Sequence, residues 1–139
     1  MLSEFRLTRR VQFYETDMAG VVHFSWYFRY MEEAEHAFWR AAGLSVASAN
    51  AEIGWPRVAA SCEYRRPLHF EEEFDVHLRV AAISEKTIRF TYALMRGADD
   101  IASGSMTVAC VDQRPGEPMR ARRIPADIAA RFEVAPSAS

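Results

Sequence analysis

Asp17 is the residue whose type and position most favour chemistry. It is the one acid in a loop that turns at Gly20 and runs into a helical pattern beginning near Ser25. The first N–H groups of a helix have no partner within the helix, so we expect those from Val22 to Phe24 to be unpaired. Such groups can hold a developing oxyanion while a carboxylate attacks a carbonyl or activates water. An acid is also common in turns, so a structural role stays open.

The other polar and aromatic side chains near this loop have two interpretations each. His23 is either a loop histidine at an interface or a hydrogen-bond donor or base beside the site. Glu32, at the edge of the helical apolar face, is either an ion-pair partner or an acid near the site. Tyr27, Tyr30 and Met31 are expected mainly in the core. Tyr27 is nearest the turn and is the best of the three for lining a pocket.

Composition excludes several classes of protein. The net charge is −2 with acids and bases interspersed, which argues against a nucleic-acid binder. No apolar run approaches the roughly 20 residues of a membrane span, and the first residues lack the apolar segment of a signal peptide. We therefore expect a cytoplasmic protein without membrane insertion, in which Cys62 and Cys110 are reduced thiols.

Several enzyme motifs are missing from the sequence. The histidines and cysteines do not have metal-ligand spacing, so no metal site is expected. There is no Gly-x-Ser-x-Gly motif of a serine hydrolase and no glycine-rich phosphate loop. These absences leave Asp17 as the main candidate for a reactive group.

The elements that must position this acid follow from hydrophobic periodicity. Residues 5–15 alternate and predict a half-buried strand, interrupted by Arg9 on its apolar face. Residues 25–42 have a period near 3.6 and an unusually wide apolar arc, so this helix should be wrapped by other structure. Ser25 is the expected N-cap of the helix and Gly43 its C-cap.

The rest of the chain is mostly alternating strand pattern, in runs joined by short connections that favour antiparallel neighbours. These runs cover residues 58–64, 74–82, 88–94 and 102–110. A short helix should start near Pro125, and residues from about 135 to 139 are expected to fray.

The predicted elements add up to one α+β domain over residues 1–139. Its curled antiparallel sheet of five to six strands should wrap around one long central helix, because the wide apolar arc must be buried. Open sheet edges favour pairing between two copies, so we expect a homodimer.

The segment from Thr16 to Ala34 resembles the signature of hotdog-fold acyl-CoA thioesterases of the 4-hydroxybenzoyl-CoA thioesterase type. This group includes thioesterases associated with the Tol–Pal system and those that act on 1,4-dihydroxy-2-naphthoyl-CoA. The matching residues are Asp17, Gly20, Val21, Val22, His23, Phe24 and Tyr27. Segments at 66–68, 86–90 and 120–127 are also similar, so the resemblance covers nearly the whole chain. Many members have Tyr-His in place of His23-Phe24, and Asn in place of Trp26.

The resemblance implies a sheet wrapped around a central helix, with dimers as the minimum unit, often tetramers, and active sites at the dimer interface. It implies hydrolysis of an acyl-CoA thioester without a metal or organic cofactor, coenzyme A being part of the substrate. Asp17 takes the place of the catalytic carboxylate, as nucleophile or general base. The backbone N–H of Phe24 takes the place of the group that polarises the thioester carbonyl.

Substrate contacts are expected in two groups. The acyl part should meet residues near the loop and the helix, namely Gly20, Val22, Tyr27 and Met31. The phosphates of CoA could meet Lys86, Arg120 and Arg122, since cations and guanidinium forks suit phosphate. Clustered charges are, however, most often a solvated face.

Two alternatives stay open beside an acyl-CoA thioesterase. One is a catalytically silent hotdog module that binds an acyl or aromatic ligand, which the intact Asp17 disfavours. The other is a thioesterase for acyl-carrier protein, because the arginines between Arg120 and Arg123 could dock an acidic carrier. Acyl length, aromatic preference and the choice between dimer and tetramer do not follow from the sequence.

Overall fold

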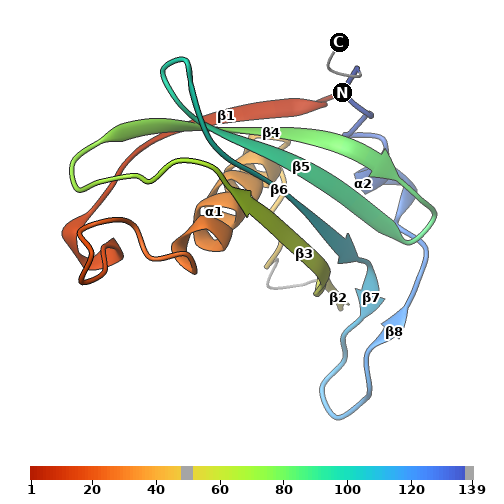
Figure 1. Cartoon of the computed structure of the whole chain (residues 1–139). Helices are drawn as coiled ribbons and strands as arrows, with labels where there is room; N and C mark the ends of the chain where they lie inside the picture. Colours follow the sequence, from red (N-terminus) through yellow and green to blue (C-terminus); the bar gives the residue numbers. More distant parts are fainter. Residues whose placement is uncertain (48–51, 137–139) are drawn as a thin grey trace.

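One long helix lies in the hollow of a curved antiparallel sheet (Figure 1). The computed structural model describes residues 1–47 and 52–136. The helix is α1 (Trp26–Ala41), and the main sheet has five strands in the order β1-β4-β5-β6-β3. These strands are β1 (Glu4–Arg10), β3 (Arg57–Tyr64), β4 (Glu73–Ile83), β5 (Thr87–Arg96) and β6 (Asp99–Ala109). The predicted α+β arrangement is therefore confirmed.

Short elements flank the main sheet. A second sheet has the order β2-β7-β8 and consists of β2 (Ile53–Gly54), β7 (Val111–Asp112) and β8 (Arg120–Ala121). A 3-10 helix, η1 (Phe13–Glu15), precedes α1, and α2 (Ala126–Ala129) follows Pro125 as predicted. Among the described helices, none is long and apolar enough to cross a membrane.

The wide apolar arc of α1 is buried under the sheet. Tyr30, Met31 and Phe38 have no exposed surface, and Phe90 of β5 is equally buried opposite them. Removing each such side chain from water contributes about 1.5–3 kcal/mol to stability. Gly104 of β6 passes so close to the helix that a Cβ there would collide with the side chain of Met31. The absence of a side chain at Gly104 therefore lets Met31 of α1 pack closely against β6.

The first strand is shorter than its alternation predicts. β1 ends at Arg10, and the backbone N–H of Gln12 then donates to the Glu15 carboxylate at 2.8 Å, which closes the turn of η1. Phe13 consequently lies 73% exposed instead of on the apolar face of a strand. A single buried acid therefore overrides the alternation and turns the chain toward α1.

The ends of α1 differ in how well the sequence predicted them. Ser25 precedes the helix as expected but is no side-chain cap, since its Oγ lies 2.8 Å from Nδ1 of His23. Gly43 adopts φ +78° and donates its N–H to Arg40 O at 2.9 Å, as a helix stop requires. At the C-terminus, the N–H of Ala135 donates to Val80 O at 2.8 Å, and residues 137–139 lie outside the described part.

Candidate active site

Asp17 lies in a small hairpin loop between η1 and α1. The N–H of His23 donates to Glu15 O at 2.9 Å, and the N–H of Asp17 donates to Val21 O at 2.9 Å. Gly20 closes the tip with φ +80° and donates to Asp17 O at 3.0 Å. Because glycine takes a positive φ without steric cost, the loop can turn back this sharply. The main chain itself therefore holds Asp17 in place.

The carboxylate of Asp17 is exposed and only half used by the fold. Its Oδ1 accepts the backbone N–H of Ala19 at 2.8 Å, which is the local bond expected of a turn acid. Its Oδ2 has no hydrogen-bond partner among the described residues. One oxygen therefore orients the group, while the other is available to a ligand.

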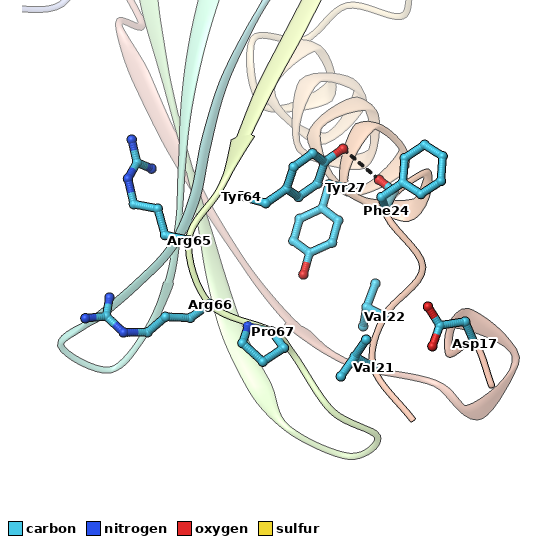
Figure 2. A pocket seen from close by; sticks show the side chains of 9 residues that line it. All are labelled: Asp17, Val21, Val22, Phe24, Tyr27, Tyr64, Arg65, Arg66 and Pro67. Atoms are coloured by element: carbon cyan, nitrogen blue, oxygen red, sulfur yellow. Dashed lines mark hydrogen bonds between the residues drawn. The ribbon is translucent and has the colours of Figure 1, made fainter. Parts of the chain in front are cut away.

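Asp17 borders a cavity of about 350 Å³ at one end of the sheet (Figure 2). The walls come from the hairpin loop, the start of α1 and the chain that leaves β3. They consist of Asp17, Val21, Val22, Phe24, Tyr27, Tyr64, Arg65, Arg66 and Pro67. Figure 2 shows Asp17 on one side of this space and the two guanidinium groups on the other, pointing away from it.

Two tyrosines form the aromatic wall of the cavity. The rings of Tyr27 and Tyr64 meet edge to face with centroids 4.9 Å apart, and the Tyr64 hydroxyl donates to Phe24 O at 3.0 Å. Burial raises the pKa of Tyr64 to about 12 and also raises the pKa of Tyr27. Both hydroxyls therefore stay protonated at neutral pH and can act as hydrogen-bond donors. The Tyr27 hydroxyl points into the cavity (Figure 2).

The prediction of three unpaired backbone N–H groups was wrong for two of them. The N–H of Val22 donates to Leu68 O at 2.8 Å, and that of His23 donates to Glu15 O. The N–H of Phe24 alone among these three has no acceptor within the described residues. The prediction fails because, before the helix begins, the loop pairs with a distant segment at Leu68 and across its own hairpin at Glu15. It leaves Phe24 as the one backbone donor of this set next to the cavity.

Four other predicted residues lie away from the cavity walls. His23 is exposed, with Nδ1 beside Ser25 Oγ, and Gly20 lies at the loop tip. Glu32 forms an ion pair with Arg57 at 2.9 Å on the rim of a separate hollow, in agreement with its interpretation as an ion-pair partner. Met31 is buried in the core.

The predicted phosphate contacts lie at the other end of the molecule. Lys86 is in the turn between β4 and β5, and Arg120 is in β8, both far from the loop before α1 (Figure 1). Arg122 lies 3.5 Å from Asp112 in an ion pair. Within one chain the structure therefore brings together Asp17, Val22, Phe24 and Tyr27 but not these three cations.

Arg65 and Arg66 are cavity residues that the sequence reasoning missed. Arg65 Nη1 donates to Ser103 Oγ at 2.9 Å, and Arg66 Nη1 donates to Asp100 O at 2.8 Å, so both are anchored on β6. The available signal was the Arg-Arg-Pro run directly after a predicted strand, of which only the resemblance at 66–68 was noted. Across the described residues, no group of three or more histidine, cysteine, aspartate or glutamate side chains could hold a metal ion.

Comparison with known proteins identifies the family. The model of the thioesterase-like superfamily matches residues 11–132. A candidate esterase of Aquifex aeolicus is 43% identical over 100 residues, which cover 70% of this chain and 76% of that protein. A 1,4-dihydroxy-2-naphthoyl-CoA hydrolase of Synechococcus elongatus is 25% identical over 116 residues, or 81% of this chain and 85% of that enzyme.

A solved structure shares the fold of the chain. The crystal structure of a hypothetical protein from Aquifex aeolicus superimposes with a TM-score of 0.86 and 32% identity, covering 93% of this chain and 99% of the other. The family model, the relatives and the helix wrapped by an antiparallel sheet are in agreement. The chain therefore belongs to the thioesterase-like superfamily, as a hotdog-fold thioester hydrolase.

Proposed function

We propose that the protein hydrolyses an acyl-CoA thioester to a carboxylic acid and free CoA in the Asp17 cavity. The observation that carries the proposal is that Asp17 and Phe24 border one cavity. Among the described residues, Oδ2 of Asp17 and the N–H of Phe24 have no hydrogen-bond partner. A carboxylate and a backbone donor are the minimum needed to attack a thioester carbonyl and to stabilise the oxyanion that forms.

The reaction follows in one of two ways from this geometry. As nucleophile, Asp17 Oδ2 attacks the carbonyl carbon, the C–S bond breaks, CoA thiolate leaves and water hydrolyses the resulting anhydride. As general base, Asp17 takes a proton from water while that water attacks the carbon, and the proton then passes to the departing thiolate. In both, the Phe24 N–H donates to the carbonyl oxygen. A thiolate is a good leaving group, so no strong general acid is required.

The aromatic walls favour an aromatic acyl group. Phe24, Tyr27 and Tyr64 border the cavity, and flat rings pack well against edge-to-face aromatic pairs. The similarity to a hydrolase of 1,4-dihydroxy-2-naphthoyl-CoA supports the same class. The resemblance to the 4-hydroxybenzoyl-CoA type is proposed only in this broader sense, as an aryl-CoA thioesterase.

A homodimer is proposed because one edge of the main sheet is open. β3 is the last strand in the order β1-β4-β5-β6-β3, and most of its residues are exposed. A second copy that pairs along β3 would cover this edge, and it would lie beside the cavity, which β3 borders through Tyr64. Sedimentation should give at least a dimer at micromolar concentration, and a monomer there would contradict the proposal.

The deciding experiment is a panel of aryl- and alkyl-CoA thioesters, with CoA release followed by a thiol reagent. We expect turnover with at least one aryl-CoA and unchanged rates after removal of metals with EDTA. The same acyl group on acyl-carrier protein tests the alternative that the arginines near Arg120 dock a carrier. Faster hydrolysis on the carrier than on CoA would favour that alternative, and no hydrolysis of any thioester would overturn the proposal.

A further inference from the structure

The carboxylate of Glu15 is fully buried two residues before Asp17, and the proposed reaction does not use it. Arg9 holds it with two nitrogens, of which Nη1 lies 2.7 Å from Oε1. The backbone N–H of Gln12 donates to Oε1 at 2.8 Å, and the Tyr30 hydroxyl donates to the same oxygen at 2.9 Å. Burying a charge is costly unless it is fully paired, and this one is paired by four donors.

These bonds join the elements that surround the hairpin loop of Asp17. Arg9 belongs to β1, Gln12 starts η1 and Tyr30 belongs to α1. The main chain of Glu15 supplies the root of the hairpin, because its carbonyl accepts the N–H of His23 at 2.9 Å. Asp17 follows Glu15 by two residues on one side of the hairpin, and Phe24 follows His23 on the other.

The network extends beyond the ion pair of Arg9 with Glu15, and it favours the ionised form of the Glu15 carboxylate. Arg9 also donates from Nε to Glu33 at 2.7 Å and lies over the Tyr30 ring, 4.6 Å from its centroid. Burial raises the pKa of Glu15, but the bonds from Arg9, Gln12 and Tyr30 outweigh it and leave that pKa below its ordinary value. The carboxylate therefore stays ionised at neutral pH.

We propose that Glu15 is a positioning residue that sets the separation between the Asp17 carboxylate and the Phe24 N–H, an inference that rests on the proposed function of these two groups. A buried ion pair usually adds little net stability over an apolar pair, whereas fixing one geometry is its best-attested use. Catalysis demands such geometry, since a misplacement of about 1 Å can cost on the order of 100-fold in rate.

The chain offers a matched control in Glu35. This residue is also buried, accepts from Arg57 Nη2 at 2.5 Å and from Trp39 Nε1 at 3.2 Å, and lies in the second half of α1. It has the same kind of partners as Glu15, an arginine and an aromatic donor, but makes no bond to the loop before α1. Loss of its charge therefore removes a buried, arginine-paired carboxylate without touching the hairpin.

The test compares Glu15→Gln with Glu35→Gln in the dimer, on the best aryl-CoA, at a temperature where both are folded by circular dichroism. We expect kcat of Glu15→Gln to fall at least about tenfold with KM within about threefold. A shift of Asp17 relative to the Phe24 N–H by less than about 1 Å is enough for this, since a full 1 Å can cost on the order of 100-fold. Glu35→Gln should keep kcat within about threefold of the parent, because it also loses a buried carboxylate but leaves the groups at the cavity in place. Equal kcat losses in the two variants, or a change confined to KM, would overturn the proposal.

A second variant covers the case in which Glu15→Gln does not fold. Tyr30→Phe removes one donor to Glu15 without removing a charge, and we expect a smaller fall in kcat, about threefold, in line with one net hydrogen bond. An unchanged kcat in folded Tyr30→Phe would then count against positioning. The proposed function fails separately: an active Asp17→Asn sinks it, whereas an inactive Asp17→Asn beside a fully active Glu15→Gln sinks only the positioning role.

Discussion

The two ends of the main sheet hold polar residues in opposite ways. At the Asp17 end, backbone bonds fix the loop and leave one carboxylate oxygen without a partner in the described chain, beside an aromatic cavity. At the other end, two of the arginines are paired: Arg123 with Glu85 at 2.9 Å and Arg122 with Asp112 at 3.5 Å. A reactive group must be held yet left free, whereas exposed ion pairs contribute little and mark a solvated surface.

The difference teaches how to weigh charged residues in a sequence of this kind. The cluster from Arg120 to Arg123 has more charge than the Asp17 loop, but Arg122 and Arg123 each have an acidic partner. Asp17 is a single acid whose carboxylate accepts only the N–H of Ala19 among the described residues, in a loop without lysine or arginine. Isolation beside a cavity is therefore the more informative property.

The largest effect is expected from removing the free carboxylate at the Asp17 end of the sheet. Asp17→Asn keeps the size of the side chain and removes both nucleophile and base, so kcat should fall on the order of 10²–10⁴-fold. The amide oxygen can still accept from Ala19, so fold and melting temperature should be unchanged. Turnover is measured on the best aryl-CoA, together with circular dichroism. A folded variant with more than about a tenth of parental kcat would show that Asp17 is a turn residue and not the catalytic carboxylate.

A smaller effect is expected for the cations that the sequence analysis predicts to bind the CoA phosphates. Lys86→Ala with Arg120→Ala should raise KM severalfold with little change in kcat, since phosphate contacts bind ground state and transition state alike. Because these residues lie far from Asp17 in one chain (Figure 1), this effect requires a neighbouring subunit. Arg66→Ala tests the cavity end in the same way. If only Arg66→Ala raises KM, the nucleotide binds at the cavity end and the prediction for Lys86 and Arg120 is lost.

A further test sharpens the role of the cavity wall. Tyr64→Phe removes the bond to Phe24 O, which is worth about 0.5–1.5 kcal/mol, and should lower kcat/KM by about threefold. The edge-to-face contact with Tyr27 would be kept, so the shape of the cavity should not change. Steady-state kinetics on one aryl-CoA and one alkyl-CoA measure the effect. A loss restricted to one substrate would assign Tyr64 to acyl selection instead.

The smallest effect is on the pH dependence of stability. The folded-state pKa of Glu15 lies below that of an unfolded glutamate, about 4.3. Its contribution is therefore complete above that pH and is lost as the pH falls through the lower folded-state value. The Tm of the parent should drop more steeply in acid than that of Glu15→Gln. Parallel curves from pH about 5 to 3 would show that the carboxylate is not held ionised by its neighbours.

Much of the architecture could be predicted because it depends on local pattern. The apolar arc of α1 and the alternation of β4, β5 and β6 are properties of neighbouring residues, and burial follows them. The failure at residues 11–15 has a specific cause. The position of Glu15 in the sequence matches the apolar face of the predicted strand. Its carboxylate instead accepts hydrogen bonds from Arg9 and Tyr30, and the chain leaves the strand to form η1.

The candidate site was predicted only in part for a similar reason. Asp17, Phe24 and Tyr27 were identified because a turn before a helix is a local feature. Arg65 and Arg66 were missed because the end of β3 reaches the cavity only through the folded sheet. Lys86 and Arg120 were assigned to the CoA phosphates by resemblance to the family. The sequence near these residues contains no information about their distance from Asp17.

The sequence by itself determined the helix, the strands and an acid held in a turn at the helix start, since each depends on residues within a few positions of one another. The tertiary structure alone decided which backbone N–H lacks an acceptor among the described residues, because the carbonyl of Leu68, far along the chain, accepts that of Val22. It also decided that Glu15 is buried and which arginines border the cavity. Those outcomes depend on pairings between distant segments, which exist only once the sheet has closed around α1.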